Sequence, residues 1–415
     1  MSQPEVFVCD AIMGSGKSQS AISYMNEHKD QKFVYITPYL EEAKRIMNGC
    51  PELEFVAPSN KLSQSNFSKI EHTRELLKAG RNITTTHAAF RSYTEDMIAA
   101  IKEYGYTLLA DEAIEVFREV EYSSGDVKLF LDGGYISFQD DSYVKVDKPY
   151  EGDRLRDLFD MIQCNNLLQV EKGKRGVQYY YWALPREILL AFKQVFIMTY
   201  LFESTELKYF FDINHIEYQY IGIEREGDSY RFSNNGHYVP DYVRTLKSKV
   251  HIFGNDKLNC IGDRRTALSA NWLRTHDTEC NTLKNNVYNY FHNYQNAKNG
   301  EVLWSTFEGS VKNLRGKGFA NQHIAFNMRA RNDWRDRTKL AYLVNIFASP
   351  QKVRFFQNYG IRYDEDGYAL SVMIQWIWRS AIRDGKEISL YIPSRRMRNL
   401  LIQWMDNCQQ GGQAD

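Results

Sequence analysis

The chain contains 415 residues, 43% of them hydrophobic, and its 52 lysines and arginines balance 52 aspartates and glutamates. The length predicts about two or three domains with sizeable cores. A net charge of zero excludes a protein that holds nucleic acid by electrostatic attraction alone. The six cysteines form no CxxC pair, so we expect no zinc site, no disulfide framework and a reducing, cytoplasmic location. No apolar run is long enough to cross a bilayer, so no membrane partner is expected.

The first 120 residues alternate short apolar runs with helical patterns. The predicted strands are residues 6–9, 33–37, 83–85 and 107–110, and the predicted helices are residues 18–26, 41–48, 69–79 and 95–104. This alternation predicts an α/β fold in which helices cover both faces of a parallel sheet. Ligands of such sheets bind at the carboxyl ends of the strands.

A glycine-containing loop, Ala11–Ser18, follows the first predicted strand and precedes the first predicted helix. The backbone N–H groups of such a loop, with the positive end of the following helix, face phosphate charge. We expect Lys17 to reach the β- and γ-phosphates of ATP and the Ser18 hydroxyl to bind Mg²⁺. The residues expected to cradle the nucleotide are Met13, Gly14, Ser15, Gly16, Lys17 and Ser18. ATP and Mg²⁺ are therefore the expected cofactors.

Two adjacent carboxylates, Asp111 and Glu112, follow the apolar strand predicted at 107–110. Phosphoryl transfer needs one carboxylate on Mg²⁺ and a second group that orients the attacking water. Asp111 suits the metal role, and Glu112 suits the role of activating water. Such a pair is often a solvated loop, but its position after a phosphate loop in the same predicted sheet favours the catalytic interpretation.

Residues 121–182 interrupt the alternation and predict a β-rich insertion. Residues 127–138 are expected to form a hairpin that turns at 132–134, and 141–147 and 176–182 are further strand-like runs. The aromatic residues here either stack nucleic-acid bases or form a small core of their own: Tyr135, Phe138, Tyr143 and Tyr179–Trp182. The basic turn Lys172–Arg175 either meets phosphates or is an exposed loop.

The rest of the chain predicts a second α/β region. Its expected strands are residues 250–253, 302–305, 322–326, 341–346 and 388–392. We therefore expect a first domain at 1–205, a connecting segment at 206–244 that resembles an irregular linker, a second domain at 245–408 and a disordered tail at 409–415.

Three motifs together resemble those of superfamily 2 helicases and translocases. Ala11–Ser18 resembles motif I, Thr37-Pro38 resembles motif Ia, and Asp111-Glu112-Ala113 resembles motif II. Further resemblances follow in the same order along the chain, at residues 83–87, 196–201 and 330–333. The resemblance implies that nucleic acid is contacted by Thr37, Pro38, Thr86, His87, Thr199, Arg329 and Arg331. For His87, the alternative is a purely structural role. For the basic run 329–337, the alternative is that these residues form an ordinary charged surface.

The last resemblance is between residues 375–383 and the motif that supplies arginine fingers in these helicases. Gln375 and Arg379 keep the spacing of that motif, whereas Arg383 lies one residue later and Trp378 stands where glycine is usual. Either arginine would stabilise charge on the γ-phosphate, and we favour Arg383. The amino-acid sequence of the C-terminal half also resembles that of DEAD-like helicases encoded by bacteriophages and prophages.

The resemblance implies two RecA-like parallel-sheet domains, with ATP in the cleft between them and the β-rich insertion in the first. It implies an ATP-dependent helicase or translocase that acts on single-stranded or forked nucleic acid, with DNA favoured over RNA. Phage replication or recombination, in the host cytoplasm and with replication proteins as partners, is the implied setting. Two alternatives remain: a packaging-type motor ATPase, and a nucleic-acid-binding ATP switch without unwinding activity.

Overall fold

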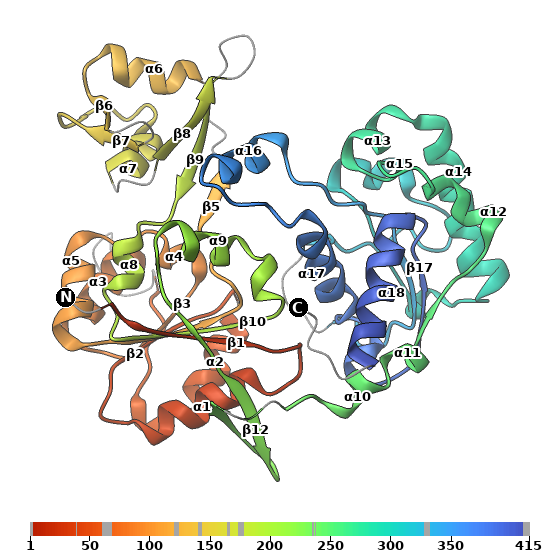
Figure 1. Ribbon diagram of the computed structural model, residues 1–415, viewed down its shortest axis with the longest axis horizontal. Helices are drawn as coiled ribbons and strands as arrows, with labels where there is room; N and C mark the ends of the chain where they lie inside the picture. The colour runs from red at the N-terminus through yellow and green to blue at the C-terminus, as the bar shows by residue number, and fades with distance from the viewer. Residues whose placement is uncertain are drawn as a thin grey trace. The chain divides into compact units, whose positions relative to one another are not determined.

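The structure is a computed structural model that describes residues 3–38, 40–59, 69–119, 124–139, 143–163, 167–172, 178–234, 236, 238–327 and 333–409 (Figure 1). The chain divides into two compact units. The first contains Met1–Asp10, Gly16–His237 and Pro350–Arg362, and the second contains Ala11–Ser15, Tyr238–Ser349 and Tyr363–Asp415. Among the described residues, no helix has the length and apolar character needed to span a membrane.

The first unit is built on a six-stranded sheet whose strand pairs are all parallel. Its order is β11-β1-β10-β4-β2-β3, with β1 at Glu5–Asp10, β2 at Phe33–Ile36, β3 at Ile83–Thr85, β4 at Thr107–Asp111, β10 at Gln194–Thr199 and β11 at Gln219–Tyr220. The longer helices of this unit are α1 (Lys17–Glu27), α2 (Leu40–Gly49), α3 (Lys69–Lys78), α5 (Glu95–Tyr104) and α9 (Glu206–Ile213), and the short ones are α4 (His87–Phe90) and α8 (Arg186–Leu190). Since β2 is buried along its whole length, its continuous apolar run is that of a central parallel strand. The predicted α/β class with a parallel sheet is confirmed.

The insertion between β4 and β10 is a five-stranded antiparallel sheet with two helices. The order is β5-β9-β8-β7-β6, with β5 at Phe117–Glu119, β6 at Ile136–Gln139, β7 at Tyr143–Val146, β8 at Leu167–Lys172 and β9 at Gln178–Ala183; the helices are α6 (Ser124–Asp132) and α7 (Arg156–Gln163). The hairpin predicted at 127–138 is wrong, because 127–132 belong to α6 and the hairpin is formed by β6 and β7. Val127 and Phe130 lie about one turn apart on α6, so both reach one core with β7 and α7. Gly134 lies just after the end of α6, and its φ of 64° is in the left-handed region that is typical of helix ends.

The insertion has its own hydrophobic core, which favours the structural interpretation of several of its aromatic residues. Tyr135 packs edge-on against Phe130 and Tyr150, whereas Phe138 is 40% exposed. The side chains of Tyr143, Tyr179 and Tyr180, and residues 173–175 of the basic turn, lie outside the part of the chain that the structure describes.

Residues 206–233 form a helix and three strands of the first unit, where an irregular linker was expected. Helix α9 is followed by β11, which joins the main sheet, and by the hairpin of β12 (Gly222–Glu226) and β13 (Ser229–Ser233). Phe232 of the hairpin stacks on Phe196 of β10, with ring centroids 5.4 Å apart. The hairpin is therefore anchored in the core of this unit.

The second unit holds a four-stranded parallel sheet of order β14-β17-β16-β15. Its strands are β14 (Val250–Ile252), β15 (Val302–Ser305), β16 (Lys339–Tyr342) and β17 (Ile388–Tyr391). Its helices are α10 (Asp241–Arg244), α11 (Leu246–Lys249), α12 (Asp256–Asn259), α13 (Ala270–Thr275), α14 (Asp277–Tyr288), α15 (Val311–Leu314), α17 (Glu365–Ile377) and α18 (Arg395–Gln409). The strand predicted at 322–326 is wrong, because that segment forms only an isolated bridge between His323 and Trp304. Gln409 ends α18, and the rest of the predicted tail lies outside the described residues.

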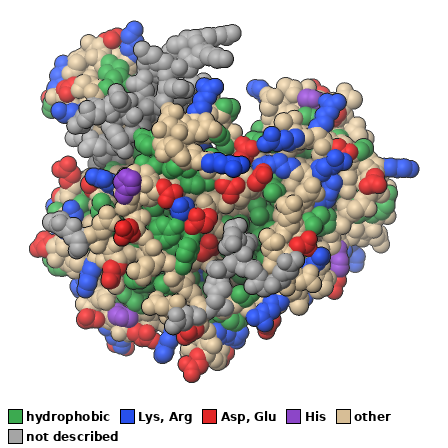
Figure 2. All heavy atoms as spheres, viewed as in Figure 1, with side chains coloured by type: hydrophobic (Ala, Val, Ile, Leu, Met, Phe, Trp, Pro, Cys, Tyr) green, Lys and Arg blue, Asp and Glu red, His purple; other side chains and the backbone are tan. Residues whose placement is uncertain are grey.

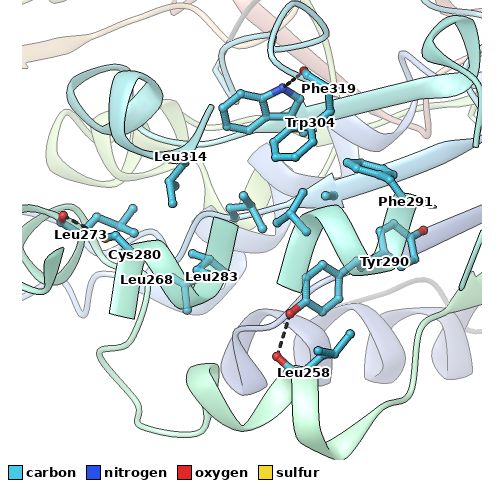
Figure 3. Close-up of a cluster of buried hydrophobic side chains, with 14 of the residues drawn as sticks. Leu258, Leu268, Leu273, Cys280, Leu283, Tyr290, Phe291, Trp304, Leu314 and Phe319 are labelled. Carbon is cyan, nitrogen blue, oxygen red and sulfur yellow. Dashed lines mark hydrogen bonds between the residues drawn. The ribbon is translucent and has the colours of Figure 1, made fainter. Parts of the chain in front are cut away.

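The core of the second unit lies between its sheet and the helices α13–α15 (Figure 3). The buried Trp304 indole belongs to this core and donates a hydrogen bond to the main-chain carbonyl of Phe319 (2.7 Å). The Tyr391 hydroxyl donates in the same way to the carbonyl of Leu258 (2.7 Å). Both aromatic residues thus bury a large apolar area while their polar atoms keep a partner.

One helix, α16 (Pro350–Asn358), follows β16 in the sequence but packs in the first unit. Phe355 lies 5.2 Å from Phe117 of β5 and stacks on Tyr181 of β9 at 5.5 Å. Phe356 packs against Tyr209 of α9 at 5.1 Å. Helix α16 therefore packs against aromatic side chains of β5, β9 and α9.

Candidate nucleotide-binding site

The loop between β1 and α1 has the backbone shape that a phosphate site requires. Gly14 and Gly16 have φ of 80° and 97°, in the left-handed region that side chains disfavour. Gly16 is the N-cap of α1, and no side chain caps that helix end. Helix starts whose N-cap residue is glycine are places where anions typically bind.

The carboxyl ends of three neighbouring strands bring the charged candidates together. Thr199 of β10 pairs with Asp10 of β1, and Met198 pairs with Asp111 of β4. Lys17, at the start of α1, lies in a cluster of electrostatic interactions with Cys9, Asp10, Asp111 and Glu112. This arrangement brings Lys17, Asp111 and Glu112 to one edge of the sheet.

Burial opposes charge on both Lys17 and Asp111. It lowers the pKa of Lys17, and the nearby negative groups only partly offset that effect. Burial, together with Glu112 and Glu42, raises the pKa of Asp111 to about 7, although Lys17 and Arg45 act in the opposite direction. A carboxylate and a lysine whose charged forms are both disfavoured by burial fit a site completed by a divalent cation and phosphates.

Glu112 has a strained backbone. Its φ is 71°, and its N–H donates to the main-chain carbonyl of Met198 (2.9 Å). A non-glycine residue is rarely found in this conformation, and such strain is concentrated at functional sites. The neighbouring strand thus holds the backbone of Glu112 in place where β4 ends.

Asp10 is a site residue that the sequence analysis missed. Its carboxylate oxygens accept hydrogen bonds from the N–H groups of Leu201 and Phe202, both at 2.8 Å. Burial raises the pKa of Asp10 despite these bonds, which act to lower it. Asp10 thereby links the start of the phosphate loop to the turn after Thr199. The only sequence signal was an acidic residue directly before the loop.

The described residues of the first unit that are candidates for nucleic-acid binding lie at the same sheet edge. Several of them already make hydrogen bonds within the protein. Thr37 is buried, and its N–H donates to Thr85 (3.0 Å). The Thr86 hydroxyl accepts from Ala89 as the N-cap of α4 (3.3 Å). The buried His87 ring, through Nε2, lies 2.8 Å from the main-chain oxygen of Asp111. Pro38 is half-buried and Thr199 is buried, whereas Arg329 and Arg331 lie outside the described residues.

In the second unit, the arginine-finger candidates differ in exposure. Arg379 is only 7% exposed just after α17, whereas Arg383 is exposed on the 3-10 turn Ala381–Asp384. Gln375, on α17, makes a long hydrogen bond to the Ser371 hydroxyl (3.5 Å). This exposure favours Arg383 over Arg379 as a group that reaches a ligand.

The segment after Asp333 lies beside the arginine-finger candidates. Arg335 forms an ion pair with Asp384, and the N–H of Ala381 donates to the carbonyl of Arg337 (3.0 Å). Residues 335 and 337 of the basic run therefore lie beside the 3-10 turn that carries Arg383. In the same unit, the Tyr242 hydroxyl donates to the main-chain carbonyl of Met13, a contact that no sequence motif signalled.

Comparison with solved structures defines the class of fold. One structure, "XPD_APO", aligns with a TM-score of 0.50 and 12% identity over 96% of this chain and 95% of its own. The structure of S. tokodaii Xpd4 aligns with a TM-score of 0.48 and 11% identity over 99% of this chain and 95% of its own. The first of these likenesses shows a fold with two RecA-like α/β domains, as predicted. A family model, the YonV C-terminal Rossmann-like domain, matches residues 244–405.

A full-length relative shows the family. The SPbeta prophage-derived uncharacterized protein YonV of Bacillus subtilis (strain 168) is 35% identical over 412 residues, which cover 97% of this chain and 99% of that protein. The chain therefore belongs to the YonV family.

Proposed function

We propose that this protein is an ATP-dependent helicase or translocase that acts on nucleic acid. The observation that carries the proposal is the convergence of Lys17, Asp111 and Glu112 at one sheet edge beside a left-handed phosphate loop. Hard oxygen ligands and an uncapped helix start are the groups that Mg²⁺ and phosphate prefer. The helicase-like fold supports a motor that uses this chemistry on nucleic acid.

Each residue then has a defined task. Lys17 and the loop N–H groups neutralise phosphate charge, and Ser18 and Asp111 supply oxygen ligands to Mg²⁺. Mg²⁺, when bound, withdraws charge from the phosphate oxygens. Glu112, held by its strained backbone, accepts a proton from the attacking water. Arg383, with Arg379 as the alternative, stabilises negative charge that develops on the γ-phosphate.

The nucleic-acid track runs along the same sheet edge. Thr37, Pro38, Thr86, His87 and Thr199 lie where β2, β3 and β10 end, so they adjoin the groups that meet ATP. Arg329 and Arg331 complete this proposed set. Over the visible face, basic side chains are interspersed with acidic ones (Figure 2), so local contacts must carry the binding.

The finer role that we propose is DNA processing in phage replication or recombination, in the host cytoplasm and with replication proteins as partners. The prophage origin of the YonV relative supports this setting. Forked or single-stranded DNA is the proposed substrate.

The test is ATPase activity without nucleic acid and with single-stranded DNA, duplex DNA, forked DNA or RNA. We expect DNA to stimulate turnover, forked DNA to be unwound, and Lys17→Ala to abolish hydrolysis while remaining folded. Hydrolysis that no nucleic acid changes would indicate a different ATPase. Stimulation without strand separation or movement would indicate an ATP switch.

A further inference from the structure

The hairpin of β12 and β13 places a tyrosine directly on the phosphate loop. A side chain added at Gly16 would lie 2.2 Å from Cδ1 and 2.6 Å from Cε1 of Tyr230. The Tyr230 ring therefore already occupies the space next to the Gly16 α-carbon. Gly16 is needed both for its φ of 97° and for this close approach.

The position of this ring is fixed by two sets of contacts. Phe232 is two residues further along β13, so it shares a strand face with Tyr230, and it stacks on Phe196 of the main sheet. Arg225 is the cross-strand partner of Tyr230, and its guanidinium lies 5.5 Å from the ring centroid. This cation–π contact and the anchored strand hold the half-buried ring beside the loop.

Gly16 directly precedes Lys17, the proposed phosphate ligand, at the end of the loop. A nucleoside triphosphate held there must lay its ribose and base against the surface that borders the loop. Tyr230 and Arg225 offer an aromatic face and a planar cation on that border, the two groups on which bases stack.

We infer that the β12–β13 hairpin is the nucleoside platform of this protein and that the base stacks on Tyr230. The inference rests on the proposed function, because it assigns a further residue to the same nucleotide site. Stacking accepts any base with a π face. The substrate class is therefore nucleoside triphosphates without selection of the base, with ATP and GTP bound alike.

The test is calorimetric titration of the full chain with Mg²⁺ and a non-hydrolysable analogue of ATP or GTP, and with inorganic tripolyphosphate. Tyr230→Ala should weaken binding of both nucleotides by about tenfold or more, and Tyr230→Phe should bind like the parent. Tripolyphosphate has no base, so Tyr230→Ala should leave its affinity unchanged.

A matched control is available in the same unit. Tyr104 packs on Gly80 much as Tyr230 packs on Gly16, with Cε1 2.8 Å from the position of an added side chain. Tyr104→Ala should leave nucleotide affinity unchanged, which separates a local role from loss of an aromatic contact. Unchanged or tighter nucleotide binding by Tyr230→Ala would overturn the inference, the latter because the ring would then be an obstruction. If the parent binds neither nucleotide nor tripolyphosphate, the proposed function itself fails.

Discussion

The buried carboxyl of Asp111 gives the clearest test of the site, because the substitution Asp111→Asn should stabilise the protein while it abolishes hydrolysis. The folded state raises the pKa of this group from 3.8 to about 7, through burial first and then through Glu112 and Glu42. Between these values the folded state binds more protons than the unfolded state. The contribution of Asp111 to stability therefore falls as the pH rises from about 4 to about 7, and it levels off above that.

The magnitude follows from the two pKa values. At about 1.4 kcal/mol per pH unit, the interval between 3.8 and about 7 sets an upper bound of about 4 kcal/mol on the cost of ionised Asp111. Since Asp111 is half-buried, water screens part of this cost, and we expect about 2 kcal/mol at pH 8. For a unit of this size, that corresponds to a rise of about 4–8 °C in Tm.

The assay is thermal unfolding of the parent and of Asp111→Asn from pH 5 to pH 8.5, without nucleotide or Mg²⁺. The gain in Tm should be small at pH 5 and should grow up to about pH 7–8. A saturating concentration of Mg²⁺ and an ATP analogue should narrow the difference, because only the parent has the carboxylate that binds the metal. An equal gain at pH 5 and pH 8, or a loss of stability at pH 8, would refute the reasoning.

Three further substitutions test other parts of the site and fold. Glu112→Gln should keep Mg²⁺–ATP bound but reduce single-turnover hydrolysis by about a hundredfold or more, because the water loses its base; turnover at the parent rate would assign the base elsewhere. Arg383→Ala should lower kcat much more than it raises KM in steady-state ATPase assays, because a finger acts on developing charge; an effect on KM alone would contradict that role. Phe356→Ala should lower the free energy of unfolding by about 3 kcal/mol in urea titrations, since its ring is fully buried; a change under about 1 kcal/mol would contradict the packing described for α16.

The first sheet was predictable because its strands are short apolar runs separated by helical patterns. A parallel strand buried on both faces reads as continuous apolar sequence, as Phe33–Ile36 does. The phosphate loop was equally plain, since its glycines stand at the two positions that need positive φ. The expected position of Asp111 and Glu112 in a ligand site then followed from the rule that ligands bind at the carboxyl ends of such strands.

Other features depended on contacts that no local pattern reports. The run Val127–Leu131 suits a strand or a helix equally, and the shared core with α7 and β7 decides for a helix. The left-handed backbone of Glu112 depends on its bond to Met198, and the burial of Arg379 depends on packing after α17. Tyr230 lay in a segment expected to be irregular, so nothing in its neighbourhood indicated the contact with Gly16.

The packing of α16 against the first unit has a practical consequence for expressing parts of this protein separately. A fragment cut to the limits of the family model, 244–405, would carry α16 without the aromatic side chains that cover Phe355 and Phe356. The complementary N-terminal fragment would in turn expose Phe117, Tyr181 and Tyr209. Each fragment would present a contiguous apolar patch, the kind of surface that drives self-association. Expression of either half alone should therefore yield aggregated material, and mixing or co-expressing the halves should restore solubility as the two sets of rings cover one another.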